Sequence, residues 1–309
     1  MRIVLLCGTK RGYLFLKKVI ELQPQTDLVV FSFREEPWEP RFLDDIREFT
    51  LASGGQFFEA RHVGSKECRL FWESAPVDLM LMVNWRYMVP ANIYCRPRLG
   101  TFVFHDSLLP EYRGFSPTVW AIINGEDHTG VTLFKITDEV DAGDIVDQEL
   151  IPIARYDTIA MVTDRVTEAY LRLLERNFDR LISGNITLWP QDHSRATYTC
   201  KRTPDDNEID WTLSSRRIYD LIRAVSTPYP GAYTYFSGRR MRVWSAQLIS
   251  GYRRYVGRVP GRVVEVVPGK GSVVLTGNGA LLLTLVQLDS HGPVSAADVL
   301  NSITHTLGH

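Results

Sequence analysis

The chain has 309 residues, 45% hydrophobic and 23% charged, which predicts a soluble globular protein with one large domain and a smaller one. A formal net charge of −1 excludes a general attraction to nucleic acid or to an anionic membrane. With no apolar run near ~20 residues and no secretory signal, and with four scattered cysteines lacking metal-site spacing, we expect a cytoplasmic protein without membrane or metal partner.

Short apolar runs alternate with segments of helical periodicity in the first 190 residues. Strands are predicted at 2–7, 27–33, 56–63, 78–84 and 101–105, and helices at 12–22 and 41–53. This alternation predicts an α/β domain over 1–190, built on a Rossmann-like parallel sheet with helices on both faces. In such sheets, ligands bind beyond the carboxyl ends of the strands.

The chain becomes polar and irregular after a strand pair and a long helix that follow the first five strands. Residues 130–136 and 144–153 predict a strand pair joined by an acidic turn, and 158–182 predicts a long amphipathic helix. The polar stretch 191–211 predicts a linker containing the loop KRTPDD. A helix at 214–225 and short strands separated by glycines then predict a β-rich domain over 212–309, an OB-like open barrel.

The stretch TFVFHDSLLPEYRG, from Thr101 to Gly114, places His105 where a strand ends and a stiff loop begins. Asp141 lies in the acidic turn, 36 residues later. Neighbouring parallel strands would bring the two together, so that the carboxylate orients the imidazole for acid–base work. From the residues alone, a structural histidine and an ordinary turn aspartate are the more frequent explanation of such a pair. The long connection 106–129 favours a functional loop.

Four stretches of the sequence carry a family resemblance. HDSLLPEYRG and INGEDHTGVTLFKITDEVDAGDIV resemble the signature region of the folate-dependent formyltransferases, which include methionyl-tRNA, glycinamide ribonucleotide and sugar N-formyltransferases. CKRTPDDNEIDW (200–211) and RAVSTPYPGAYTYFSGRRMRVW (223–244) closely resemble the formyltransferase half of the enzyme that modifies UDP-4-amino-4-deoxyarabinose. The resemblance covers about residues 75–300.

The resemblance implies formyl transfer from N10-formyltetrahydrofolate to a primary amine, without a metal. His105 and Asp141 match the family's catalytic histidine and aspartate. Two segments match the surroundings of the folate pterin. They contain Trp85, Arg86, Tyr87 and Met88 in the first segment, and Asp138, Glu139, Val140 and Asp144 in the acidic turn.

The chain departs from the family at Val103, where the Asn-x-His motif has its asparagine. Valine cannot donate a hydrogen bond to the developing oxyanion, and loss of such a donor elsewhere costs roughly 10²–10³ in turnover. Three explanations are open. His105 acts with a backbone N–H or a water; Asn84 or Asn124 supplies the amide; or the domain is a non-catalytic folate- or nucleotide-binding module.

The acceptor that the resemblance favours is a dTDP- or UDP-linked amino sugar. The residues expected to contact it are Ser107, Arg113, Gly114, Lys201 and Arg202, with Tyr112, Phe115 and Trp120 as candidates for stacking on the base. Methionyl-tRNA is the alternative, although REEPWEPRFLDDIREF is more acidic than basic where the tRNA enzymes carry a basic insertion, which argues against a nucleic-acid partner. An amine on another scaffold and a homodimer both stay open.

Overall fold

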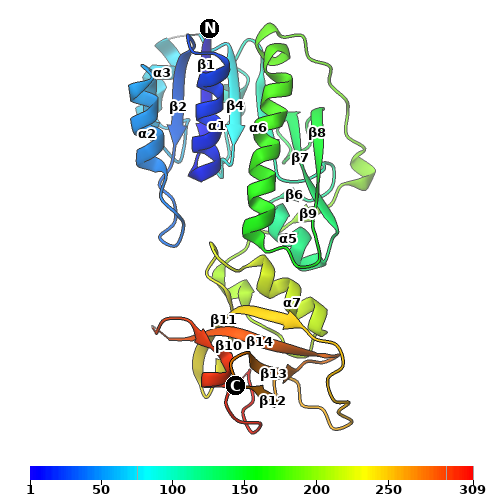
Figure 1. Cartoon of the computed structure of the whole chain (residues 1–309). Coiled ribbons are helices and arrows are strands. Elements are labelled where there is room, and N and C mark those ends of the chain that lie inside the picture. The colour runs from blue at the N-terminus through cyan, green and yellow to red at the C-terminus, as the bar shows by residue number, and fades with distance from the viewer. Residues whose placement is uncertain (75, 290, 309) are drawn as a thin grey trace. The chain divides into compact units, whose positions relative to one another are not determined.

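The computed structural model describes residues 1–74, 76–289 and 291–308 (Figure 1). The chain divides into two compact units. The first comprises 1–117, 128–152 and 163–200, and the second comprises 118–127, 153–162 and the chain from 201 onward. The predicted domains, 1–190 and 212–309 with a linker between, are contiguous, whereas the second unit also takes in two earlier segments.

The first unit is built on a seven-stranded mixed sheet with the order β3-β2-β1-β4-β5-β7-β8. Its strands are β1 (Arg2–Cys7), β2 (Asp27–Ser32), β3 (Gln56–Glu59), β4 (Leu79–Val83), β5 (Thr101–His105), β7 (His128–Lys135) and β8 (Ile145–Pro152). The first five strands are parallel, and β1, β2 and β4 are almost entirely buried. β7 runs antiparallel to both β5 and β8. The predicted α/β class is therefore confirmed, with a mixed rather than an all-parallel sheet.

Helices cover both faces of this sheet. They are α1 (Thr9–Leu22), α2 (Leu43–Ala52), α3 (Lys66–Ser74), α4 (Ala91–Tyr94) and α6 (Ile159–Ser183). On one face, Phe71 and Trp72 of α3 pack with Phe31 of β2. On the other face, Phe15 of α1 and Tyr170 of α6 pack against Phe104 of β5, with ring centroids 4.8 and 5.5 Å away.

The connection 106–129 contains structure that its sequence pattern does not predict. It holds the short strand β6 (Arg113–Gly114), which pairs in parallel with β9 (Tyr198–Thr199), and the helix α5 (Pro117–Asn124). The pairing of β6 with β9 fixes the end of the SLLP loop to a segment about 85 residues away in the chain.

The second unit contains an antiparallel sheet with the order β10-β11-β14-β13-β12, in which β15 pairs with β14. Its strands are β10 (Ala232–Phe236), β11 (Arg239–Leu248), β12 (Val263–Val267), β13 (Gly271–Leu275), β14 (Ala280–Leu288) and β15 (Val294–Ser295). Two helices accompany them, α7 (Ser215–Ala224) and α8 (Ala296–Val299), and Ser214 and Ser295 cap their N-termini. The prediction of a β-rich C-terminal domain is confirmed.

A buried polar network anchors the end of β5. One guanidinium nitrogen of Arg11 donates to both carboxylate oxygens of Asp106 at 2.7 Å. The Tyr170 hydroxyl contacts the same carboxylate and donates to the carbonyl of Phe104 at 2.9 Å. Burial opposes the charge of Asp106, but Arg11 and Tyr170 outweigh it and hold the pKa of Asp106 below its usual value.

Replacement of Asp106 by Asn is expected to lower the free energy of unfolding by about 3 kcal/mol at neutral pH, because Arg11 stays charged and only 7% exposed. Since the pKa of Asp106 is lowered by folding, its stabilisation is present above the unfolded value of about 3.9 and is lost as the pH falls below it. The difference between wild type and Asp106→Asn should therefore shrink below about pH 4. Chemical denaturation of both proteins, at neutral pH and below pH ~4, measures this difference in the free energy of unfolding.

Asp164→Asn is the matched control. Asp164 pairs with Lys10 at 3.5 Å, and both side chains are more than 60% exposed. Its loss should cost less than about 0.5 kcal/mol. Equal small losses in the two variants would contradict a stabilising role for the buried pair.

Candidate active site

The carboxyl end of β5 presents different side chains to the two faces of the sheet. Val103 and His105 share one face because side chains alternate along a strand, whereas Phe104 and Asp106 lie on the other. Val103 packs with Trp85, Tyr94 and Ile136 against the core beneath α3. His105 is 9% exposed at the end of this apolar strip.

Asp141 reaches His105 by a different route from the predicted one. His105 pairs with Thr132 and Phe102 pairs with Lys135, so antiparallel β7 ends beside the start of β5. The turn 136–144 must fold back along the sheet to bring an Asp141 oxygen to 3.6 Å from His105 Nδ1. The two residues do lie together, but the expectation that neighbouring parallel strands bring them there is wrong.

Both ring nitrogens of His105 face acceptors. Nε2 lies 2.9 Å from the carbonyl oxygen of Tyr112, and Nδ1 faces Asp141. The backbone N–H of Gly114 donates to the same Asp141 oxygen at 2.8 Å. A neutral imidazole carries only one N–H, so it can donate to only one of these two acceptors at a time.

The backbone around this pair is held in unusual conformations. Asp141 has φ of 50° and Tyr112 has φ of 59°, values that residues other than glycine seldom adopt. Gly114 has φ of 102°, and a Cβ on it would lie 2.7 Å from the carbonyl oxygen of Thr199. Such conformations persist where surrounding contacts fix them, and they gather at functional sites.

The segment predicted to lie along the pterin follows β4 directly. The rings of Trp85 and Tyr87 contact each other and Phe33, and the indole N–H of Trp85 is buried without a hydrogen-bond partner among the described residues. Arg86 makes a two-pronged ion pair with Glu39, and Met88 is 74% exposed.

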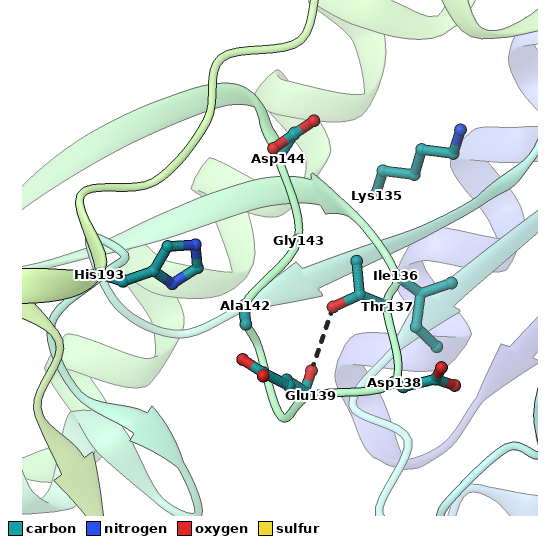
Figure 2. A pocket seen from close by; sticks show the side chains of 9 residues that line it. All are labelled: Lys135, Ile136, Thr137, Asp138, Glu139, Ala142, Gly143, Asp144 and His193. Atoms are coloured by element: carbon teal, nitrogen blue, oxygen red, sulfur yellow. Dashed lines mark hydrogen bonds between the residues drawn. The ribbon is translucent and has the colours of Figure 1, made fainter.

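The acidic turn borders a cavity of about 550 Å³ in the first unit (Figure 2). The lining residues include Lys135, Glu139, Asp144 and His193, but neither His105 nor Asp141. Asp138 is tied to α4, because the Tyr94 hydroxyl donates to its carboxylate and this bond raises the pKa of Tyr94 to about 12. Val140 is 47% exposed.

The two asparagines suggested as substitutes for the missing amide lie in different places. Asn84 follows β4 and has φ of 52°, and its amide nitrogen donates to Thr9 Oγ1 at 2.8 Å. Thr9 follows β1, which borders β4 on the side away from β5. The amide of Asn84 is therefore directed away from His105. Asn124 is the last residue of α5 and belongs to the second unit.

The residues expected to contact the acceptor are divided between the two units. In the first unit, Ser107 is 2% exposed and donates to the carbonyl of Glu111, and Arg113 is only 1% exposed. In the second unit, Lys201 is exposed, and Arg202 lies over the Trp120 ring at 4.8 Å, where burial lowers the pKa of Arg202. The burial of Arg113 disagrees with its expected role as a phosphate ligand.

Several residues that shape the site were not predicted from the sequence. They are Arg11, Tyr170, Gln191, Thr197 and Thr199. Thr197 accepts from the backbone N–H of Tyr112 at 2.8 Å, and Thr199 donates to the carbonyl of Arg113 at 3.0 Å. The described residues contain no cluster of histidine, cysteine and acidic side chains that could hold a metal ion, and no helix among them could span a membrane.

Solved structures of similar fold include HypX from Aquifex aeolicus in complex with tetrahydrofolic acid, with 18% identity and a TM-score of 0.62. The match covers 97% of this chain and 47% of HypX, so the chain spans about half the length of that protein. The N-formyltransferase from Helicobacter canadensis, in complex with folinic acid and dTDP-3-aminofucose, has 16% identity, a TM-score of 0.67, and coverage of 91% and 98%. Methionyl-tRNA formyltransferase from Clostridium thermocellum has 18% identity and a TM-score of 0.58, and the match covers 82% of this chain and 95% of that protein.

Family models match both parts of the chain. The model described as formyl transferase matches residues 4–177, which include β5, His105 and Asp141. The model described as formyl transferase, C-terminal domain, matches residues 201–304, which include the antiparallel sheet of the second unit. The chain therefore belongs to the formyltransferase family, with both its N-terminal and its C-terminal domain.

Proposed function

We propose that this protein transfers a formyl group from N10-formyltetrahydrofolate to the amino group of a nucleotide-linked sugar. The observation that carries the proposal is the His105–Asp141 pair, 3.6 Å apart at the end of β5 and held by contacts from the SLLP loop and β6. The acceptor class is supported by the neighbour from Helicobacter canadensis, whose structure holds folinic acid and dTDP-3-aminofucose.

A folate fits the residues beyond β4. The indole N–H of Trp85 is buried and lacks a hydrogen-bond partner among the described residues, which is costly unless a ligand supplies an acceptor. Trp85 and the acidic turn both flank the strip that leads to His105. We assign the folate to this region, with the formyl group toward His105.

The reaction forms a bond between the amine nitrogen and the formyl carbon, gives a tetrahedral oxyanion, and then breaks the bond from that carbon to N10. The amine loses a proton, and N10 gains one. His105 transfers this proton and stabilises the oxyanion. Asp141 faces Nδ1, so its carboxylate stabilises the imidazolium that forms.

Val103 supplies no amide to stabilise the oxyanion. Because the Asn84 amide is committed to Thr9, we assign oxyanion stabilisation to His105, with water or a backbone N–H as the second donor. His105 then does alone much of what the family's asparagine and histidine share.

Turnover should be measured by mass spectrometry with N10-formyltetrahydrofolate and a panel of dTDP- and UDP-amino sugars, with methionyl-tRNA alongside. We expect one amino sugar to gain a formyl group, and His105→Ala to lower kcat by about 10²–10⁴, the usual contribution of a general acid–base. His128→Ala, at an exposed site at the start of β7, is the control.

Each other result of this assay selects a different function. Formylation of methionyl-tRNA, with affinity that falls steeply with salt, would support the tRNA alternative. Folate binding without turnover of any acceptor, or turnover that His105→Ala leaves unchanged, would favour the binding module.

Val103→Asn restores the amide at the family's position. If the oxyanion lacks a donor there, we expect kcat to rise by about tenfold, part of the 10²–10³ that one such donor contributes. Val103→Leu is the control, since leucine has the shape of asparagine without its hydrogen bonds. Equal losses of kcat in both variants would mean that another group already fills this role.

A further inference from the structure

Arg113 is the largest fully buried side chain in the described part of the chain, and its charge has no acidic partner there. One terminal nitrogen donates to Gln191 Oε1 at 2.6 Å and lies 3.0 Å from His193 Nδ1. The other donates to the Tyr198 hydroxyl at 3.2 Å, and the guanidinium carbon lies 5.8 Å from the Tyr198 ring centroid. Nε is buried without a hydrogen-bond partner among the described residues, so dipoles and a ring balance only part of the buried charge.

Gln191 contacts both Arg113 and the turn that carries Asp141. Its amide nitrogen donates to the carbonyl of Asp141 at 2.9 Å and to the carbonyl of Gly143 at 2.7 Å. Arginine can only donate, so the amide oxygen must face Arg113 and the NH₂ group must face the two carbonyls. Gln191 is 6% exposed, which leaves water little access to replace these bonds.

The turn needs such support at this point. Asp141 has φ of 50°, a conformation that surrounding contacts must impose. A Cβ on Gly143 would lie 1.6 Å from the carbonyl oxygen of Lys135, so the turn passes directly against the end of β7. The charge of Arg113 polarises the Gln191 amide and strengthens its two donated bonds.

We infer that Arg113 and Gln191 are positioning residues that hold Asp141 against His105, an inference that rests on the proposed function of that pair. Neither side chain touches the reacting groups. Neighbouring Gly114 holds the Asp141 carboxylate, whereas Gln191 holds the Asp141 backbone. The sequence motif YRG therefore acts on Asp141 through both residues 113 and 114.

Gln191→Met tests this inference, because it keeps the length of the side chain and removes all three hydrogen bonds. We expect kcat to fall by up to about 100-fold, since a misplacement of about 1 Å has that effect, while KM for the folate changes less than about twofold. Arg113→Met should have a similar effect, and the double variant should be no worse than either single variant. If the two losses of kcat added up in the double variant, Arg113 and Gln191 would act independently, and the inference would be contradicted.

A second readout does not require turnover. The backbone N–H of Gly114 donates to the Asp141 carboxylate at 2.8 Å, so the NMR chemical shift of this amide proton and its exchange with solvent report whether Asp141 is held in place. In Gln191→Met, we expect the Gly114 amide proton to change its chemical shift and to exchange faster, as it should in Asp141→Asn. An unchanged Gly114 amide in Gln191→Met would overturn the inference, even if the protein formylated no acceptor in the panel.

Asn177→Leu is the matched control. Asn177 is buried and, like Gln191, takes part in three hydrogen bonds, which join it to Asp147, Leu173 and Arg180 and do not involve the turn. This variant should lower stability about as much as Gln191→Met and leave the Gly114 amide unchanged. If both variants changed the Gly114 amide equally, general loosening of the domain would explain the effect and the inference would fail. If wild-type protein formylated nothing while the Gly114 amide behaved as expected, only the proposed function would fail.

Discussion

The opposite orientation of two successive side chains at the end of β5 is the constraint on which the site depends. Asp106 is anchored on one face of the sheet by Arg11 of α1 and Tyr170 of α6. His105 must then face the other side, because strand geometry allows no other arrangement. The ion pair between Arg11 and Asp106, on the face covered by α1 and α6, therefore fixes the direction of the His105 imidazole on the opposite face.

The antiparallel strand β7 imposes a second constraint. Its end lies beside the start of β5, so a short turn into β8 would leave Asp141 far from His105. The turn 136–144 instead folds back and is attached along its length. Asp138 accepts from Tyr94, Gly143 packs on Lys135, and Asp141 is held by Gly114 and Gln191. A mixed sheet thus achieves a juxtaposition that parallel neighbours would give directly.

The sequence predicted the elements with strong periodicity well. The strand 2–7 and the strand 101–105 agree with β1 and β5 to the residue, and α6 was expected within one residue at each end. That His105 and Asp141 lie together was also expected, mainly from the family resemblance. The strand direction of β7 was missed, because hydrophobic periodicity is the same in parallel and antiparallel strands. The roles of Arg113 and Gln191 were missed because a buried arginine looks like a surface one in sequence, and its partners lie 78 and more residues away.

The pairing of β6 with β9 has a consequence for the order of synthesis. Residues 191–199 supply Gln191, Thr197 and Thr199, which hold the loop after His105 and the turn around Asp141. A nascent chain that ends before this segment already contains both residues of the pair but lacks the contacts that fix them. On the ribosome, the site therefore takes its final form only after the whole first unit has emerged.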